Sequence, residues 1–336
     1  MAEFASDSVD TVVIGGGLAG CLAAITLARR NRRVVLLEAK SYPQHKVCGE
    51  FLSPECLPIF DEAGFLPALQ ALHPVIIRTA RITAPDSTAW QTTFPAPGTG
   101  ISRYALDAAL AVYAASLGVE VCDGIRVNRI DGSLDDGFRL TAVRTNGTST
   151  FRAKTVIAAH GKHSNLDRVL NRTFLRTRHA YVGLKRHFTG ASLHDHLDLH
   201  VFPGGYCGMS DVEDGKTNVC LLVRQDVFQR ETSNEGIDQF IGWMSEQNPY
   251  LHQWLTRATP LYDHWISIGQ VTLVPKSPLE GDILLAGDAA GMIAPLAGDG
   301  MAMALQSGVL AANLIDRYLE HQLTASELKR QYARSW

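Results

Sequence analysis

Apolar residues near the start of the chain follow a strand–helix–strand pattern. A continuous apolar run at Val9–Ile14 predicts a buried strand, and a second run that ends at Glu38 predicts another. Small apolar residues between the two runs predict a helix that packs closely on them. The turn before this helix contains Gly15, Gly17 and Gly20. We therefore interpret this region as a βαβ unit with a glycine-rich first turn.

The rest of the chain mixes strand and helix patterns. Half-buried strands alternate apolar and polar positions, and we predict them in residues 75–94, 125–157 and 180–225. Helical apolar spacing is found in residues 104–117, 235–258 and 300–319. A further buried strand is predicted at residues 283–286. The prolines of residues 41–60 predict an irregular segment.

The order of these elements predicts an α/β fold with two domains. A Rossmann-like domain that binds a dinucleotide is interrupted by an inserted antiparallel sheet that holds a substrate. We expect the dinucleotide-binding domain to comprise residues 1–74, 98–178 and 274–336. The substrate domain would then comprise residues 75–97 and 179–273.

The glycine-rich turn has the spacing of a dinucleotide-binding motif. Gly15 permits the tight bend, Gly17 lets the backbone approach a pyrophosphate, and Gly20 lets the helix pack closely on the sheet. The simpler alternative is an ordinary βαβ unit with a glycine-rich turn. The order of strand, turn, helix, strand and acid favours the dinucleotide site.

Neighbouring residues would complete this site. The N–H groups of Leu18 and Ala19 begin the helix, where the positive end of the helix dipole attracts phosphates. Glu38, followed by Ala39, ends the second strand where a carboxylate accepts hydrogen bonds from the adenosine ribose.

Composition excludes several classes of protein. The chain has 336 residues, of which 46% are hydrophobic and 19% charged, with a net charge of −3. It has no basic run, so we expect no nucleic-acid partner. Its six cysteines are scattered without a C-x-x-C pair, and no signal peptide precedes the first strand. These features favour a reducing, cytoplasmic location and argue against disulfides or a zinc site.

The most apolar stretch, residues 289–315, approaches the length of a membrane span. It contains Pro295, Asp299 and several glycines, which a helix in a bilayer tolerates poorly. We therefore expect a loop followed by a buried helix, and no transmembrane segment.

One cluster has the spacing of a metal site. His194, His196, Asp198 and His200 would share one face of a strand. Polar residues on the solvent side of an antiparallel strand give the same pattern. We favour this second interpretation and expect no metal.

Two later segments identify the dinucleotide. Residues 283–291 read ILLAGDAAG, and residues 295–300 read PLAGDG before the long predicted helix. Together with the N-terminal glycines, they resemble the FAD-dependent oxidoreductases of the p-hydroxybenzoate hydroxylase fold, and most closely the geranylgeranyl-reductase-like branch. Further markers lie within residues 46–50, 102–107, 158–164 and 202–219, so the resemblance covers most of the chain. It implies an FAD-dependent enzyme.

The resemblance also implies which residues contact FAD. Asp288, after Gly287, would accept hydrogen bonds from the ribityl hydroxyls. The helix start at Asp299 would direct N–H groups at the flavin, where a helix dipole stabilises the anionic reduced form. Further contacts are implied for Lys46, Cys48, Gly49, Arg103, Val127, Gly161, Pro295, Gly298, Gly300 and Met301.

Some of these assignments have simpler alternatives. Asp288 has the sequence context of a plain helix N-cap, and Arg103 that of a surface arginine near a helix start. Cys48 and Val127 are equally consistent with packing in a core.

One position departs from the family pattern. Hydroxylases of this fold usually have Asp-Gly where this chain has His160-Gly161. In the family this motif helps with both FAD and NADPH, so the change puts direct use of NADPH in doubt. The electron source is left open between NAD(P)H and a separate flavin reductase or other electron-transfer partner. Alternatively, His160 forms hydrogen bonds near the pyrophosphate in place of the aspartate.

The sequence gives only weak candidates for catalysis. Residues 202–208, FPGGYCG, resemble the substrate-domain signature of the reductase-like branch, which approaches the flavin face. Tyr206 and Cys48 are therefore candidate catalytic residues, although a tight hairpin with a packed tyrosine explains the segment equally well. We expect a hydrophobic small-molecule substrate between the inserted sheet and the flavin.

Three functions are consistent with the motifs. We narrowly favour a monooxygenase that hydroxylates an aromatic or polyketide-like molecule. The first alternative is a reductase of C=C bonds in an isoprenoid, and the second is a flavin electron-transfer protein without small-molecule turnover. Flavin-dependent halogenases share the fold but typically carry W-x-W-x-I-P, which this chain lacks.

Overall fold

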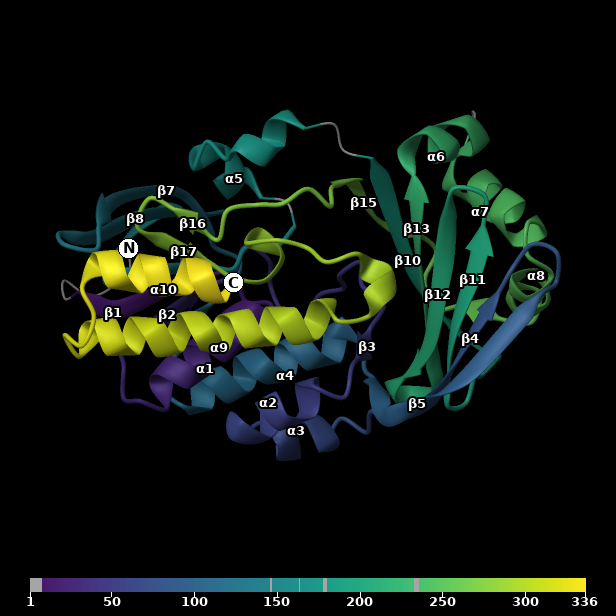
Figure 1. The fold of residues 1–336 in the computed structure, drawn as a ribbon, viewed down its shortest axis with the longest axis horizontal. Coiled ribbons are helices and arrows are strands. Elements are labelled where there is room, and N and C mark those ends of the chain that lie inside the picture. The colour runs from purple at the N-terminus through teal and green to yellow at the C-terminus, as the bar shows by residue number, and fades with distance from the viewer. Residues whose placement is uncertain (1–7, 146, 163, 178–179, 233–235) are drawn as a thin grey trace.

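Two sheets organise the chain, and helices pack against each of them (Figure 1). The computed structural model describes residues 8–336 except residues 146, 163, 178–179 and 233–235. We call the eight-stranded sheet the parallel sheet and the nine-stranded sheet the curled sheet.

The parallel sheet is built around the predicted βαβ unit. Its strands run in the order β16 (Leu279–Glu280), β17 (Ile283–Leu285), β9 (Gly147–Ala158), β1 (Val9–Ile14), β2 (Val34–Leu37) and β6 (Glu120–Cys122). All neighbours from β17 to β6 pair in parallel. The first part of β9 also pairs with β8 (Gly137–Arg144), which continues to β7 (Arg126–Ser133) as an antiparallel meander.

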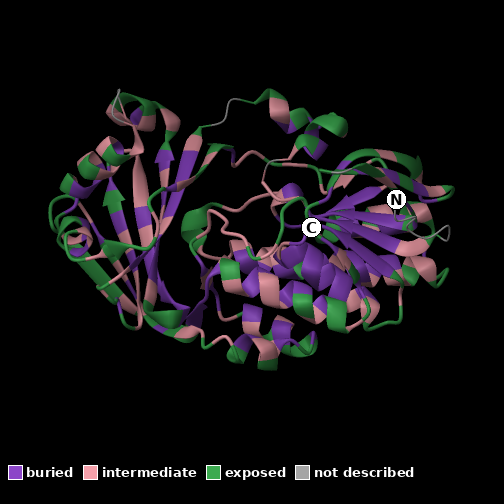
Figure 2. Ribbon diagram, turned by 180° about the vertical axis from the view of Figure 1, so that it is seen from behind, coloured by how far each residue is buried: buried purple, intermediate pink, exposed green. Residues whose placement is uncertain are grey.

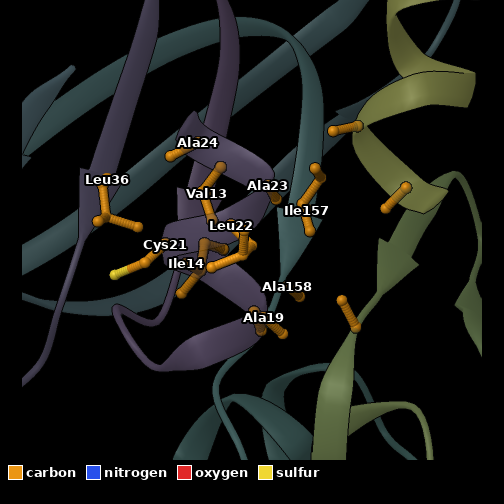
Figure 3. Close-up of a cluster of buried hydrophobic side chains, with 14 of the residues drawn as sticks. Val13, Ile14, Ala19, Cys21, Leu22, Ala23, Ala24, Leu36, Ile157 and Ala158 are labelled. Carbon is orange, nitrogen blue, oxygen red and sulfur yellow. The ribbon is translucent and has the colours of Figure 1, made fainter. Parts of the chain in front are cut away.

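Helix α1 (Leu18–Ala28) is central to the packing of this half of the molecule. It is apolar on every side, and Cys21, Leu22 and Ala23 are completely buried, as expected for a helix enclosed by other elements. Figure 3 shows these side chains against Val13 of β1 and others from the parallel strands. On its other sides, α1 packs against α4 (Arg103–Ser116) and α9 (Gly300–Leu319). Helix α10 (Ala325–Ser335) packs beside α9.

The curled sheet forms the other half of the molecule. Its order is β14 (Thr259–Pro260), β10 (Tyr181–Thr189), β13 (Lys216–Arg224), β12 (Gly205–Val212), β11 (His196–Phe202), β4 (Val75–Thr83), β5 (Ala89–Gly100) and β3 (Phe51–Leu52), with β15 (Ile266–Val271) also paired to β10. Helices α6 (Gln225–Thr232), α7 (Ile237–Glu246) and α8 (Pro249–Leu255) lie along its outer side (Figure 1). The outward side chains of its strands pack with theirs in a second core, and Figure 2 shows buried residues in both halves.

The structure confirms the mixed α/β fold with a Rossmann-like parallel sheet and a second, mainly antiparallel sheet. One strand pair differs from the prediction, because β4 and β11 pair in parallel. These two strands come from separate parts of the chain, so no hairpin constrains them to be antiparallel. The division of the chain into two domains at the expected boundaries stays a prediction.

The prediction of an irregular segment at residues 41–60 is wrong for its second part. Residues 51–52 form β3, and α2 (Cys56–Glu62) begins soon after. Pro58 lies in the first turn of α2, where the missing N–H has no helical partner to lose. Short helices α3 (Leu66–Gln70) and α5 (Asn165–Val169) were also not predicted.

The apolar stretch at residues 289–315 contains a loop followed by the long helix α9, as predicted. Within the described residues, no helix combines the length and apolar character needed to cross a membrane.

A close approach between α1 and α9 depends on Gly308. A Cβ atom added at this position would lie 2.2 Å from the carbonyl oxygen of Ala19. We expect Gly308→Ala to lower the free energy of unfolding by about 1–3 kcal/mol through overpacking, despite the better helix propensity of alanine. Urea denaturation of the purified protein measures this change.

Gly242→Ala is the matched control, because Gly242 lies within α7 and a Cβ added there would have no atom within 4 Å. This substitution should leave stability unchanged or raise it by up to about 1 kcal/mol. Equal effects at the two glycines would contradict the packing argument.

Candidate cofactor and substrate site

A large cavity lies between the carboxyl ends of the parallel strands and the inner face of the curled sheet. Its volume is about 1190 Å³. Pockets for single ligands typically have about 300–1,000 Å³, so this cavity has room for a large ligand and a second molecule beside it. Its position also fits the rule that open α/β sheets bind ligands at the carboxyl ends of their strands.

The cavity brings together residues that are far apart in the sequence. Among the predicted cofactor residues, all but Gly20 and Asp299 line it: Gly15, Gly17, Leu18, Ala19, Glu38, Ala39, Lys46, Cys48, Gly49, Arg103, Val127, Gly161, Gly287, Asp288, Pro295, Gly298, Gly300 and Met301. Tyr206 also lines the cavity. Asp299 is instead the N-cap residue of α9, without a side-chain capping bond.

The geometry of the glycine turn matches the physical role expected of each glycine. Gly15 has a φ of +102°, which favours glycine. Gly17 is the N-cap of α1 and has no side chain. The first N–H groups of the helix therefore have no capping side chain as a partner at the cavity. A Cβ at Gly20 would lie 1.8 Å from the carbonyl oxygen of Gly15, which explains why this position needs glycine although it does not line the cavity.

Glu38 stabilises the glycine turn directly. One carboxylate oxygen accepts a hydrogen bond from the N–H of Gly16 at 2.7 Å, and the other accepts from the N–H of Lys40 at 3.0 Å. Tyr42 donates from its hydroxyl to the carbonyl oxygen of Gly16 at 2.5 Å. Glu38 therefore fixes the turn while it also lines the cavity. Its contact with a ribose stays a prediction.

Two cations lie beside the start of α1. A Cβ added at Gly17 would be 3.4 Å from both the guanidinium of Arg103 and the ammonium of Lys46. The completely buried Asp107 accepts two hydrogen bonds from Arg103, at 2.7 and 2.8 Å, and its carboxylate is 3.0 Å from Lys46. Burial opposes ionisation of Asp107, but the two cations outweigh it and hold its pKa below the usual 3.8. Positive charge is thus held where a pyrophosphate would lie.

A second buried ionic cluster was not predicted. Glu50 is completely buried, and its carboxylate accepts from Lys185, from His187 at 2.7 Å and from the N–H of Arg103 at 2.6 Å. Burial opposes ionisation, but Lys185 and His187 hold the pKa of Glu50 below 4.5. Glu50 was noted only as the end of the Lys46–Glu50 segment, because its partners on β10 carry no local sequence signal.

The other glycine–acid turn also adjoins the start of α1, because a Cβ added at Gly287 would lie 3.0 Å from the Cβ of Ala19. Gly287 has a φ of +62° and follows β17, and its N–H donates to Ser307 of α9 at 2.8 Å. The carboxylate of Asp288 lies 4.0 Å from the ammonium of Lys162 and lines the cavity. The turns after β1 and β17 therefore face one common space.

Residues 8–184 match the model of a protein family described as an FAD binding domain. The chain belongs to this family. FAD is accordingly its cofactor, and the protein is an FAD-dependent oxidoreductase of the kind that the sequence motifs indicated.

Similar proteins include both reductases and halogenases. The chain is 27% identical to a menaquinone reductase of Mycolicibacterium smegmatis, over 91% of this chain and 76% of that protein. It is 28% identical to digeranylgeranylglycerophospholipid reductase 2 of Methanopyrus kandleri, over 97% and 82%. A flavin-dependent halogenase of Armillaria mellea is 26% identical, over 95% and 69%.

Solved structures confirm the fold. The myxobacterial chondrochloren halogenase has a TM-score of 0.84 at 20% identity, over 97% of this chain and 78% of that chain. A geranylgeranyl bacteriochlorophyll reductase-like protein from Thermoplasma acidophilum has a TM-score of 0.81 at 22% identity, over 98% and 83%.

The residues around the cavity fit FAD. Bare backbone is available at Gly49, Gly161 and Gly300, where an added Cβ would have no atom within 4 Å. We expect the N–H groups at the start of α1, with Lys46 and Arg103, to hold the pyrophosphate. Asp288 would hold the ribityl chain. Bound FAD supplies the redox chemistry, while the protein supplies binding, orientation and electrostatics.

The two candidate catalytic residues flank the substrate side of this cavity. Cys48 belongs to a loop held by Asn218 of β13, which donates to the carbonyl oxygens of Cys48 at 3.1 Å and Gly49 at 2.9 Å. Tyr206 is the second residue of β12, and burial raises the pKa of its hydroxyl well above 10. Both residues line the cavity. Their participation in catalysis stays a prediction.

The solvent-facing interpretation of the polar face in β11 is wrong for Asp198 and His200. Each has an exposure of 1%. Asp198 accepts hydrogen bonds from Arg81, and the Nδ1 atom of His200 lies 2.8 Å from the hydroxyl of Thr83, beside Asn248 at the start of α8. The sequence could not show that helices cover this side of the sheet. Within the described residues, no group of three or more His, Cys, Asp or Glu side chains is arranged to hold a metal.

We predict that Asp288 and Asp299 differ sharply in their effect on FAD affinity. Asp288→Ala removes a carboxylate that lines the cavity, so FAD should bind roughly 10–100-fold more weakly, as expected for lost hydrogen bonds to a charged group. Titration of the apoprotein with FAD, followed by flavin fluorescence, measures the change. Asp299→Ala is the control and should leave the affinity within about twofold. An equal loss in both variants would argue against the assigned position of the ribityl chain.

We also predict that His200 makes stability depend on pH. Burial lowers its pKa from 6.5 to about 4. The unfolded chain therefore binds a proton below about pH 6.5 that the folded chain excludes, so stability is complete above this pH and is lost as the pH falls toward 4. Between pH 6.5 and 5, His200 should account for about 2 kcal/mol.

Urea denaturation across this pH range tests the prediction by comparing the wild type with His200→Asn. As the pH falls, the free energy of unfolding should decrease more steeply for the wild type than for His200→Asn. The difference in slope should correspond to one titrating group. His321→Asn is the control, because His321 is exposed and its positive φ is one that asparagine tolerates. If both variants keep the slope of the wild type, His200 does not act in this way.

Proposed function

We propose that this protein uses FAD to reduce a carbon–carbon double bond in an apolar, isoprenoid-type substrate. The observation that carries the proposal is the chemical character of the inner face of the curled sheet. Among the described residues that this sheet contributes to the cavity wall, none carries a charge. An apolar wall suits an isoprenoid substrate, and hydroxylation of a phenol would gain from a base that this sheet does not provide.

Strand pairing defines a continuous inner face. One row of facing positions runs across six strands through Ile266, Lys185, Cys220, Gly208, Leu199 and Ile82, and it ends at Trp90 of β5. Lys185 is directed into the buried cluster with Glu50. The row is otherwise apolar or nearly so, and Ile82 and Trp90 are 37% and 57% exposed. Ile266, Cys220, Gly208 and Leu199 of this row line the cavity, so an apolar molecule bound there would contact these four residues.

Two glycines lie in the middle of this face. Gly183 and Gly208 are on neighbouring rows and have no side chain to fill the cavity. Apolar side chains come close to both glycines, since a Cβ added at Gly183 would lie 3.1 Å from Ile268 and from Val47, and one added at Gly208 would lie 3.4 Å from Leu199. A charged substrate would lose its hydration there without a partner, whereas an apolar chain would gain from burial.

The available polar groups favour reduction. Reduction of a double bond requires a hydride at one carbon and a proton at the other. Reduced FAD, when bound, would supply the hydride. The proton would come from the hydroxyl of Tyr206 on the curled sheet or from the thiol of Cys48 on the adjacent loop, both of which line the cavity. Hydroxylation of a phenol would instead gain from a base that removes its proton; among its described residues the curled sheet offers none to the cavity, although His45 and Glu50 on the loop of Cys48 also line it. The two similar reductases support the same choice.

Turnover without oxygen tests this proposal. We expect protein containing chemically reduced FAD to reduce geranylgeraniol or a menaquinone in an anaerobic cell. The absorbance of oxidised flavin should return, and mass spectrometry should show a product that has gained two hydrogen atoms. Replacing Cys48 with alanine or Tyr206 with phenylalanine should slow this step for the residue that donates the proton, and Tyr206→Phe should leave FAD affinity unchanged.

Other outcomes would identify the competing functions. A product that gains oxygen, formed only in air, would make the protein a monooxygenase, as the sequence narrowly favoured. A halogenated product in the presence of chloride or bromide would make it a halogenase. Reoxidation only by a partner protein would indicate electron transfer. The assay also distinguishes NAD(P)H from a separate flavin reductase, because only a direct donor reduces the isolated protein.

A further inference from the structure

We infer that His160 binds the ribityl–pyrophosphate linker of FAD through its Nδ1 atom, held in place by Asp167. The inference concerns the cofactor alone, so it holds whichever reaction the protein catalyses. His160 stands where related hydroxylases usually have an aspartate, and the structure shows what this histidine contacts.

The position of His160 places it beside the expected path of the linker. It follows β9, which lies between β1 and β17 in the parallel sheet. A Cβ added at Gly15 would be 2.9 Å from the Cα atom of His160, so the histidine adjoins the glycine turn. The turn with Asp288 follows the strand on the other side. A cofactor that spans the two turns must pass the end of β9.

One nitrogen of the His160 ring is fixed by a buried carboxylate. Its Nε2 atom lies 2.9 Å from Oδ1 of Asp167, whose side chain is completely buried. The other carboxylate oxygen accepts from the N–H of Ser164 at 3.0 Å. Arg172 also approaches Asp167, at 3.4 Å, and donates to the carbonyl oxygens of Ser277 and Ala289. Since an ionised carboxylate only accepts, Nε2 carries a hydrogen and the ring orientation is set.

Ionisation of Asp167 is consistent with this arrangement. Burial opposes the charge, but hydrogen bonds from His160 and Ser164 together with the charge of Arg172 hold its pKa below 3.8. The same pattern is used where a carboxylate orients a histidine that binds a ligand through its other nitrogen.

The second ring nitrogen has no partner. The Nδ1 atom of His160 is buried and makes no hydrogen bond with any described residue. The side chain is only 5% exposed, yet His160 lines the cavity. A buried polar atom without a partner is costly, and native structures normally satisfy such atoms. With the hydrogen on Nε2, Nδ1 of the neutral ring accepts, so a ribityl hydroxyl of the FAD linker would satisfy it by donating, whereas an ionised phosphate oxygen would not.

We test the inference by comparing two ligands and three variants. His160→Leu should weaken binding of FAD about tenfold, as expected for the loss of one such hydrogen bond. The affinity for adenosine monophosphate should not change, because this ligand contains the adenosine half and one phosphate but not the ribityl linker. Equal losses for both ligands, or no loss for FAD, would overturn the inference. His160→Asn provides a smaller polar replacement that keeps the test available if the leucine variant does not fold.

His200→Leu is the matched control. His200 is also buried, and its Nε2 atom, 3.8 Å from the carboxylate of Asp198, also makes no hydrogen bond with the described residues, but His200 does not line the cavity. This variant should lose stability and keep its affinity for FAD. A loss of FAD affinity similar to that of His160→Leu would show that any buried histidine has this effect, and would overturn the inference.

A spectroscopic readout does not depend on the stability of the leucine variant. In protein labelled with ¹⁵N-histidine, the Nδ1 resonance of His160 can be assigned from its absence in the His160→Asn variant. We expect this resonance to move when FAD is added to the wild-type apoprotein, and to move much less with adenosine monophosphate. A resonance that does not respond to FAD would overturn the inference.

Discussion

The carboxylate of Glu50 connects the two halves of the molecule. It contacts Lys185 and His187 of the curled sheet and the backbone N–H of Arg103 at the start of α4. All of these groups are buried, and a charge left there without partners would be very costly. Both sheets and the loop that carries Lys46 and Cys48 must therefore come together before Glu50 is satisfied. The shape of the cavity depends on this contact.

Arg103 links this contact to the binding of an anionic cofactor. Its backbone is bonded to Glu50 and its guanidinium to Asp107, which also holds Lys46. Two buried carboxylates thus orient two cations beside the start of α1, where the helix dipole adds to the positive potential. This arrangement lets positive groups face the cavity while every buried charge keeps a partner. The cofactor site is consequently organised by residues that need not touch the cofactor themselves.

Local patterns in the sequence predicted much of this site. The glycine spacing after β1 and the Gly-Asp pair after β17 depend on backbone geometry within a few residues, so both were recognisable. The pairing of Glu50 with Lys185 joins residues 135 positions apart, and Lys185 lies in no recognised motif. The polar face of β11 was misinterpreted for a similar reason. Alternating polar and apolar residues show that a strand has two different faces, but they do not show which face is covered by a helix from a distant part of the sequence. The short helix α2 was missed because a proline in a first turn resembles a helix breaker.

The parallel pairing of β4 with β11 affects how the curled sheet assembles as the chain is synthesised. Arg81 and Asp198, which face each other across this pair, are 117 positions apart, and much of the parallel sheet is encoded between them. The hairpin of β4 and β5 therefore leaves the ribosome long before its neighbour exists, and its inner edge stays open in the meantime. Contacts of such long range form slowly, and open strand edges invite incorrect pairing. The order of translation thus makes completion of the substrate wall a late event in the folding of this protein.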